Sequence, residues 1–432
     1  MDELQSVEQH IPLPTGTNPE SLSPFLPALK RLFNSAKRFL FNPAVILAVF
    51  LLSTLAAVLL KVSFDFQNNG IGYISNVNNF VVFRNSFYHL IEHSRIYGFM
   101  PGVQDDQFLY SPTFALLFAP FALLPKYVGV VVWSVFNSMI LFYAIRRLPL
   151  DDGKKAFISW FILVELISTT QNVQSNPLVA ALFILTFVAF ESRRVALAAL
   201  FVAISFYVKI FGVMGGLLFL VYPQRLKFAG WAAFWALLLF LLPLTVVSWK
   251  ELSDYYVAWY GALQETHAHY TDQIFISVMR MVEGMRGAAL SDAGRYVVQI
   301  AAFVLFSVKF LNRKAFNSTR YRMAVLSSVM VWCIIFNHAS ESNHYVIAAL
   351  GVALWYVSGE RHRLDLALLI GAFVLGASPS SLFPSYLRTQ FVAPLGLMAL
   401  PFFLIWLKTE FELTTSTTNN FLNSTDSRYA QD

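Results

Sequence analysis

Charged residues are scarce in this chain. Of its 432 residues, only 13% are Asp, Glu, Lys or Arg, while 57% are hydrophobic and 16% are aromatic. A soluble protein carries about 25% charged residues. Only helices and closed barrels satisfy their backbone groups in lipid. Because long apolar runs recur along the chain, the composition excludes an ordinary soluble domain and predicts an all-α polytopic membrane protein.

Several common sequence features are missing. The single cysteine, Cys333, lies within an apolar run, so an intrachain disulfide is excluded. There is no Gly-rich phosphate-binding loop and no Ser-nucleophile motif, which excludes a cytoplasmic nucleotide-binding domain. We expect no cleavable signal peptide, because the first apolar stretch begins late, at residue 43, and is long.

The apolar runs predict a helical bundle with about 10–13 transmembrane helices. We place twelve, at 43–61, 127–145, 156–170, 177–191, 195–208, 211–222, 228–247, 295–311, 323–337, 345–357, 364–381 and 390–407. Several are shorter than the roughly 20 residues of a full span. We therefore expect some to tilt, or to be broken helices covered by their neighbours.

Basic residues alternate with these runs. Four precede the first run, and later clusters fall in every second loop, at 146–155, 193–194, 225–227, 309–322 and 361–363. Positive charge marks cytoplasmic loops. We therefore expect a multi-pass membrane protein with both termini in the cytoplasm. The net charge of +6 follows from these loops, so no nucleic-acid partner is expected.

The same pattern divides the chain into three parts. Residues 1–41 are expected to form a cytoplasmic N-terminal segment and 42–410 the transmembrane domain. Residues 411–432 are rich in Ser, Thr and Asn and are expected to be a flexible cytoplasmic tail.

Most of the unusual polar residues fall on the opposite, outer face. It receives the two long loops, 62–112 and 249–294, and the short segments 171–176, Lys209, 338–344 and 382–389. Within the first long loop, 80–97 has apolar residues near helical spacing. We expect it to lie as a helix in the membrane interface.

Lys209 is the sharpest of these polar features. It stands between two apolar halves, "ALFVAISFYV" and "IFGVMGGLLFLV". A lysine at membrane depth is costly and by default indicates function. Its ammonium group suits a phosphate as a compact point charge. The alternative is a side chain that only reaches out of the lipid to the interface.

Two further segments offer polar side chains to the same face. "TTQNVQSNPL" brings the amides of Gln174 and Asn176, which suit a sugar or phosphate site or, alternatively, cap the next helix. In "FNHASESNHYVIA", His338, Glu341 and His344 are spaced by three and would share one helix face. They favour a phosphate or hydroxyl site, with a structural polar cap as the alternative.

The same histidines and glutamate are the sequence's candidate metal ligands. A lone His-Glu-His set without a second cluster is a weak metal signal, so we expect no cofactor, with a divalent metal as the open alternative. Arg388, in "PSYLR", is a further candidate ligand for phosphate.

The first outer loop carries carboxylates that could act as a general base. They are Asp65, Glu92, Asp105 and Asp106. Each taken alone is explained by solvation. Asp105 and Asp106 stand just before Tyr110 at the start of an apolar run.

Three segments of the first half together resemble the N-terminal half of glycosyltransferase family 87, a group of polytopic GT-C-type enzymes. They are "NNFVVFRNSFYHLIEHSRIYG", "YSPTFALLFAPFALLP" and "VVWSVFNSMILFYAIRRLP". "QSNPL", the later Lys209 and "FNHASES" resemble the family's Gln-x-Asn-x-Leu segment, its intramembrane lysine and its Asn-His element. The resemblance extends over most of residues 75 to 405.

The resemblance implies a GT-C-like fold and a reaction. A hexosyltransferase, with mannose as one candidate sugar, would move a sugar from a polyprenyl-phosphate donor to an envelope lipid or glycan on the periplasmic face, with inversion. It implies an acidic base in the first outer loop and phosphate binding by Lys209 and His338. Tyr110, Gln174 and Asn176 would position sugar or phosphate.

One position departs from the family pattern. Many members carry Asp shortly before the "FVVFRNSFYHL" element, where this chain reads "NVNNF", with Asn78 and Asn79. An amide cannot act as a carboxylate base. We expect the role to have moved to Asp106 or Asp105, with Glu92 and Asp65 as alternatives, and Asn79 to retain a positioning role.

Two other functions fit parts of the pattern. Twelve spans, broken helices and an intramembrane lysine also suit a transporter or flippase of a lipid-linked or small polar substrate. However, the polar residues gather on one face, and no inverted repeat is apparent. The asparagines in place of Asp also suit a non-catalytic scaffold.

Overall fold

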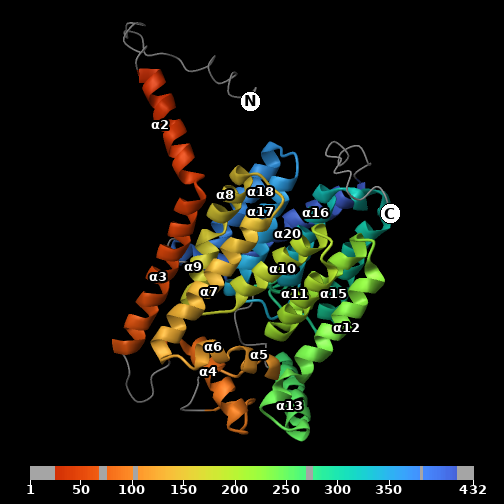
Figure 1. The fold of residues 1–432 in the computed structure, drawn as a ribbon. Coiled ribbons are helices and arrows are strands. Elements are labelled where there is room, and N and C mark those ends of the chain that lie inside the picture. The colour runs from red at the N-terminus through yellow and green to blue at the C-terminus, as the bar shows by residue number, and fades with distance from the viewer. Residues whose placement is uncertain (1–24, 68–74, 101–105, 269–275, 380–382, 416–432) are drawn as a thin grey trace.

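The computed structural model describes residues 25–67, 75–100, 106–268, 276–379 and 383–415. Within these ranges the chain is helical and contains no strand. Figure 1 shows long helices running side by side, with shorter helices crossing one end of the bundle. The predicted all-α polytopic class is therefore confirmed.

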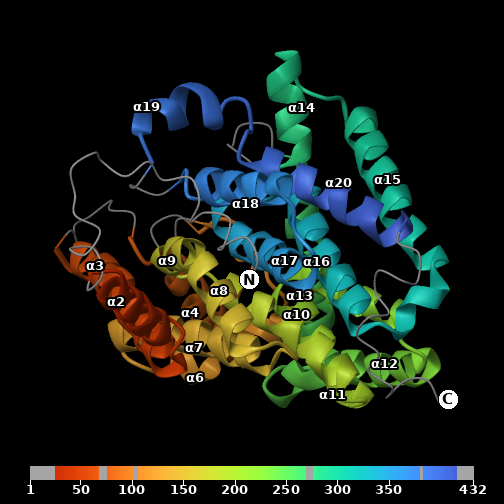
Figure 2. The ribbon, with the colours of Figure 1, turned by 90° about the horizontal axis from the view of Figure 1, so that it is seen from above.

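Three helices form the centre of the bundle. They are α10 (Asn176–Glu191), α16 (Thr319–Ile335) and α17 (Tyr345–Ser358). Nearly every residue of each is buried, and Figure 2 places them near the middle of the molecule. Because such helices meet protein on all sides, they are apolar all round rather than amphipathic.

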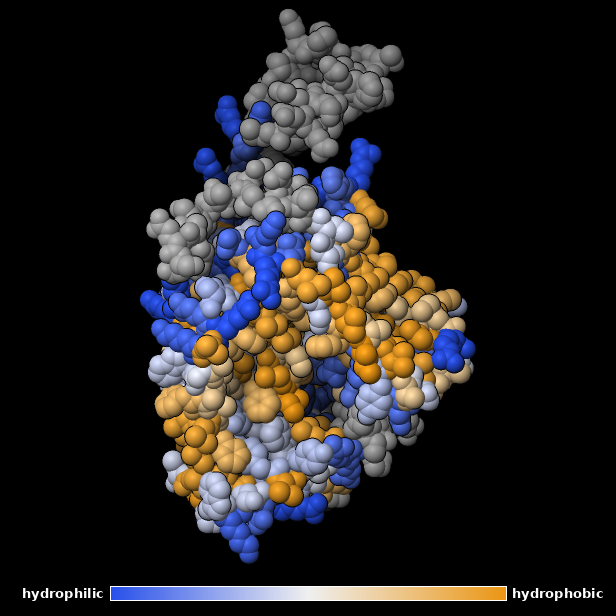
Figure 3. Space-filling model, turned by 90° about the vertical axis from the view of Figure 1, so that its right-hand side faces the viewer, coloured by the Kyte–Doolittle hydropathy of each residue, from blue (hydrophilic) through white to orange (hydrophobic). Residues whose placement is uncertain are grey.

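The helices around this centre have one apolar side that faces outward. Four described helices are long and apolar enough to cross a membrane: α3 (Pro43–Gln67), α7 (Lys126–Arg147), α12 with η4 (Arg225–Thr245) and α15 with η6 (Asp292–Leu311). Between 17% and 50% of each is buried. Figure 3 shows an apolar band around the middle of one face, with hydrophilic residues above and below. This is the surface of a protein solvated by lipid.

The remaining elements of the bundle are shorter than full spans. They are α2 (Phe25–Leu40), α8 (Asp152–Phe161), α9 (Leu163–Gln171), α11 (Val195–Val208), η3 (Ile210–Val221), α18 (Arg363–Gly376) and α20 (Ala399–Thr415). The sequence pattern predicted such short and broken helices. The count of 10–13 spans stays a prediction, because four helices meet the criteria of length and composition.

Polar side chains fix where several helices begin. Ser111 accepts a hydrogen bond from the N–H of Phe114 at the start of α5 (Pro112–Leu117). Asp151 does the same for Lys154 at the start of α8. Such caps satisfy N–H groups that the helix leaves unpaired.

Ion pairs join the helices at one end of the bundle, called here the basic end. Arg322 of α16 binds Glu191 at the end of α10, with Nε and Oε1 2.6 Å apart. Lys309 binds Glu410 of α20 at 2.8 Å, and both side chains are almost fully buried. Breaking one partner of such a pair leaves an uncompensated charge, so these contacts hold the C-terminal helices in register.

The opposite end, called here the site end, carries the crossing helices. They are α4 (Asn78–Ile91), α5, α6 (Ala119–Ala122), α13 (Trp249–Ala268), α14 (Val278–Arg286), α19 (Ser385–Leu387) and η9 (Arg388–Val392). The predicted interfacial helix 80–97 corresponds to α4. It ends earlier than expected, and two residues later His93 has a positive φ of 55° that turns the chain away.

The two long outer loops meet at the site end. Tyr255 of α13 donates to the carbonyl of Ser94 at 3.0 Å, and Trp259 donates to Leu109 at 3.0 Å. Two boundaries differ from expectation. The boundary at 410 falls within α20, which runs to Thr415. The last span, placed at 390–407, begins in η9 and is an α-helix only from Ala399. The expected tail beyond 415 lies outside the described residues.

Candidate functional site

Polar side chains from six separate segments meet at the site end. These segments are the start of α4, the loop before α5, the loop after α9, the start of α10, the end of α11 and the loop after α16. We call the set that they form the polar centre. It comprises Asn79, Tyr110, Gln174, Asn176, Lys209, Asn343 and His344.

Lys209 lies at the middle of the polar centre. The helix α11 ends at Val208, and Lys209 is extended (φ −147°, ψ 126°) before η3 begins at Ile210. Its Nζ donates to Oδ1 of Asn176 at 2.8 Å and lies 2.9 Å from Nε2 of His344. The break between the two helices thus turns the amine toward protein groups instead of lipid.

Asn176 holds the start of α10 against α17. Its side chain is fully buried, and its Nδ2 donates to the carbonyl and to Oδ1 of Asn343, at 2.8 and 3.0 Å. Pro177 follows within the first turn, where no N–H is needed. Asn176 therefore fixes the position of the oxygen that Lys209 contacts, and the sequence-based capping alternative does not account for these side-chain contacts.

His344 connects Lys209 to Glu341. The imidazole Nδ1 accepts a hydrogen bond from the backbone N–H of Glu341 at 3.1 Å, while Nε2 faces Lys209. The short helix η8 (Ser342–His344) brings these residues to the start of α17. The predicted spacing of three between Glu341 and His344 does place them side by side. Asn343, between them, was missed, because nothing in its spacing separates it from an ordinary loop residue.

A second part of the polar centre joins α4 to the loop after α9. Asn79 donates from Nδ2 to the carbonyl of Asn172 at 2.8 Å, and its Oδ1 accepts from Gln174 at 3.0 Å. Tyr110 donates from its hydroxyl to Oε1 of Gln174 at 3.0 Å. Burial raises the pKa of the Tyr110 phenol, so the hydroxyl stays protonated and can donate. The ring of Tyr110 lies 5.7 Å from Nζ of Lys209, which links the two parts.

Val173 adopts a backbone conformation that is unusual for a β-branched residue. Its φ is +51°, and the side chain is buried. Trp133 of α7 donates to its carbonyl at 3.2 Å. Positive φ at a β-branched residue costs energy and persists where surrounding contacts enforce it, often at functional sites. On either side of it, the backbone carbonyl of Asn172 and the side-chain amide of Gln174 both contact Asn79.

The predicted carboxylates lie in different surroundings. Asp65 is buried at the end of α3 and accepts hydrogen bonds from Lys126 at 2.7 Å and from Ser75 at 2.7 Å. Glu92 is exposed just after α4. Asp106 is exposed and accepts a hydrogen bond from Nδ2 of Asn78 at 3.1 Å. Asp105 lies outside the described residues.

The other two predicted phosphate ligands, His338 and Arg388, are not among the residues of the polar centre. His338 lies in the loop after α16 and is half-buried, and the imidazole within reach of Lys209 is that of His344. Arg388, at the start of η9, donates to the carbonyl of Pro379 at 3.4 Å. It lines a hollow beside the polar centre.

That hollow has a volume of about 510 Å³ and a mixed polar and apolar lining. Glu341, Arg388, Asn172 and Asn343 contribute to its wall. Asn172 and Asn343 also hydrogen-bond Asn79 and Asn176. The hollow and the polar centre therefore lie next to each other and share Asn343. We call it the Glu341 hollow.

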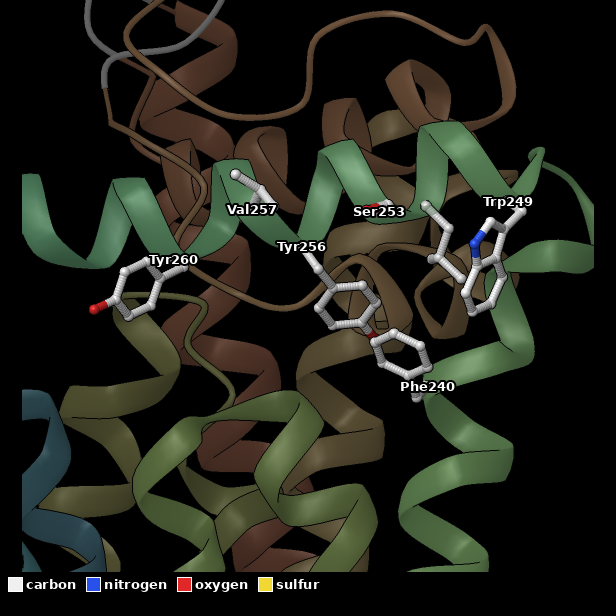
Figure 4. A pocket seen from close by; sticks show the side chains of 7 residues that line it. Phe240, Trp249, Ser253, Tyr256, Val257 and Tyr260 are labelled. Carbon is white, nitrogen blue, oxygen red and sulfur yellow. The ribbon is translucent and has the colours of Figure 1, made fainter.

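A second hollow of about 330 Å³ lies under α13 and is mainly apolar. Figure 4 shows α13 crossing above α12, with Trp249, Tyr256 and Tyr260 pointing toward the bundle. The ring of Tyr256 stacks on Phe240 of α12, with centroids 4.4 Å apart. The Tyr256 hydroxyl lies 2.8 Å from Oγ1 of Thr113 in α5. We call this hollow the aromatic groove.

The described residues contain no group of three or more His, Cys, Asp or Glu side chains that could hold a metal ion. The spacing of His338, Glu341 and His344 does not bring such a group together there. Amide, amine and hydroxyl groups dominate the polar centre instead. These are donors for oxygen-rich ligands such as phosphates and sugars.

Comparison with known proteins identifies the family. No curated protein matches the chain. A model of glycosyltransferase family 87 matches residues 108–337, which is more than half of the chain and includes Tyr110, Gln174, Asn176 and Lys209. Asn79, Glu341, His344 and Arg388 lie outside the matched range. The chain belongs to glycosyltransferase family 87 and is a membrane glycosyltransferase.

Proposed function

We propose that the protein transfers a hexose from a polyprenyl-phosphate donor to an envelope lipid or glycan, with inversion at the anomeric carbon. The observation that carries this proposal is Lys209, an amine held among amides and an imidazole at a helix break. Such an amine, at the site end of a membrane glycosyltransferase, suits the phosphate of a lipid-linked sugar.

Lys209 would act on the leaving group. When the bond between the anomeric carbon and phosphate oxygen breaks, negative charge develops on the lipid phosphate. A cation placed beforehand in a site shielded from water stabilises that charge without reorganisation. Asn176 holds the amine at 2.8 Å, and Tyr110 and Gln174 would position the sugar. His338 would contribute from the loop beside His344.

The aromatic groove supports a lipid-linked donor. Its wall is formed by Phe240, Leu252 and aromatic residues of α13, which suit an isoprenoid chain. Thr113 contacts Tyr256 of the groove. Two residues before Thr113, the hydroxyl of Ser111 donates to the carbonyl of Tyr207 at 2.6 Å. Lys209 follows Tyr207 by two residues. The groove is thus connected to the polar centre through a few contacts.

The proposed place of the reaction is the periplasmic face of the inner membrane. The basic loops would lie in the cytoplasm, which puts the site end on the outer side, where the donor carries its own activation. Two described carboxylates, Asp106 and Glu341, lie near enough to act electrostatically on Tyr110. A carboxylate of the site end would receive the acceptor proton. We propose no metal or other cofactor.

A transfer assay tests this function. Purified protein in nanodiscs would be mixed with radiolabelled polyprenyl-phosphate sugars and an envelope lipid extract. Label moving to a new product establishes the transfer. Label that stays in every donor, while the same protein in liposomes moves donor between leaflets, would replace the proposal with transport.

A further inference from the structure

We propose that Glu341 is the general base of the transfer and that the Glu341 hollow binds the polyhydroxylated headgroup of the acceptor. This inference rests on the proposed function and names the residue that receives the acceptor proton. It differs from the expectation that Asp105 or Asp106 takes that role.

The surroundings of Glu341 suit a base. Its carboxylate is exposed to the hollow side, and its Oε2 accepts from Nδ2 of Asn343 at 2.8 Å. Its backbone N–H is bound to His344. The Glu341 side chain also accepts from the backbone N–H of His344. The carboxylate is therefore held in place at the wall, and its remaining lone pairs can accept from a ligand. A base has to lie within hydrogen-bond reach of the proton it removes.

Two of the carboxylates expected from the sequence have other partners. Asp65 is buried and paired with Lys126. Asp106 accepts from Asn78 and does not line the Glu341 hollow. Among the described residues that form its wall, Glu341 is the one carboxylate and Arg388 the one cation. Asn78 and Asn79 carry amides, which cannot take up a proton as a carboxylate does.

The hollow has room and polarity for a sugar-like headgroup. Arg388 stands on η9 and donates to the carbonyl of Pro379, while Glu341 stands on the loop before α17 and accepts from Asn343. Guanidinium N–H groups donate in a fixed fork, and the carboxylate accepts. A ligand carrying several hydroxyls can satisfy both groups at once, together with the Ser342 and Thr389 residues of the wall.

His344 joins the segment that carries the proposed base to the phosphate-binding amine. Its Nδ1 lies 3.1 Å from the backbone nitrogen of Glu341, and its Nε2 lies 2.9 Å from Nζ of Lys209. The backbone of Glu341 and the amine of Lys209 are therefore neighbours of the same imidazole. A single displacement needs the attacking hydroxyl and the leaving phosphate on opposite faces of the sugar carbon.

The proposed transfer is a single displacement at the anomeric carbon. Glu341 removes the proton of the acceptor hydroxyl, and that oxygen forms a bond to the anomeric carbon. The bond from this carbon to the phosphate oxygen breaks, and its electron pair leaves with polyprenyl phosphate beside Lys209. The proton on Glu341 then passes to water through the open hollow.

The test compares Glu341→Gln with Asp106→Asn in the transfer assay and in donor binding. Glu341→Gln preserves the shape of the side chain, so donor binding and melting temperature should match those of the wild type. We expect its kcat to fall about 100-fold or more, the size of a general-base contribution. Asp106→Asn should stay within about threefold of wild type. Glu360→Gln, an exposed glutamate at the basic end, is the matched control.

A second variant separates chemistry from folding. Glu341→Ala should regain activity when formate is added, because the small carboxylate can occupy the space left in the hollow. Full activity of Glu341→Gln, or loss of transfer in Asp106→Asn alone, would overturn the assignment of the base while leaving the proposed function intact. Wild-type protein that transfers no sugar would instead overturn the proposed function.

Discussion

At the scale of single residues, the important groups are held by partners from distant parts of the sequence. Lys209 meets Asn176 and His344, which lie 33 and 135 residues away. The sequence predicts that a lysine in an apolar stretch has a function, because its burial is costly. It cannot predict these partners, since they depend on how α10, α11 and α17 pack.

Replacing Lys209 tests the phosphate-binding role. Lys209→Met removes the charge and preserves most of the length of the side chain. Because one preorganised donor to developing charge is worth about 100-fold or more in rate, we expect transfer to fall by that factor in steady-state assays. Lys250→Met, an exposed lysine on α13, should retain wild-type activity. Equal loss in both variants would contradict a specific role for Lys209.

Restoring the usual acid at Asn79 should not restore a base. In Asn79→Asp, a carboxylate oxygen would replace the donor that lies 2.8 Å from the carbonyl of Asn172, and two acceptors would face each other. We expect a loss of about 1–3 kcal/mol of stability, measured as a lower melting temperature in detergent, and lower activity. A more active Asn79→Asp variant would show that the site still accepts the usual arrangement.

At the scale of helices, sequence periodicity predicted most elements and few of their exact ends. The runs at 177–191, 195–208 and 345–357 correspond closely to α10, α11 and α17. The region 113–124 forms two short helices, α5 and α6, that meet at Phe118. The break falls just before Pro120, which lacks the N–H that would continue α5 and stands in the first turn of α6. The local sequence does not contain the partners of Ser111 and Thr113, which bond to the carbonyls of Tyr207 and Leu239 on other helices.

Close packing of α16 and α17 depends on a small residue. A Cβ on Gly351 would lie 2.9 Å from Cγ2 of Val331 and 3.0 Å from the carbonyl of Ser327. Helices in membranes approach closely at such residues. Gly351→Val should therefore destabilise the protein by about 1–3 kcal/mol, seen as a lower melting temperature. Gly230→Val, where a Cβ meets nothing within 4 Å, should have little effect, and equal effects would contradict the packing argument.

At the scale of the whole molecule, the two ends of the bundle have different chemistry. Ion pairs such as Arg322–Glu191 and Lys309–Glu410 join helices at the basic end. Amides, hydroxyls and Lys209 meet at the site end. The sequence predicted that the outer segments share a face, and the structure brings them to one end. Their order around the Glu341 hollow follows from tertiary packing and could not be predicted.

The orientation in the membrane is tested by labelling single cysteines. Cys333 is the only cysteine and is buried, so Cys333→Ala gives a suitable background. In intact bacterial cells with a permeabilised outer membrane, a membrane-impermeant maleimide should label Lys250→Cys at the site end. It should label Lys154→Cys only after the inner membrane is opened. The reverse pattern would place the site in the cytoplasm and contradict the proposed periplasmic reaction.

The central claim is that the polar centre is the donor site, and photocrosslinking tests it most directly. A polyprenyl-phosphate probe with a diazirine near the phosphate would be irradiated with the protein, and its adducts mapped by mass spectrometry. The account predicts adducts within residues 206–211 and 338–344 that unlabelled polyprenyl phosphate prevents and that Lys209→Met reduces. Competed adducts confined to the basic end, or none at either end, would contradict it.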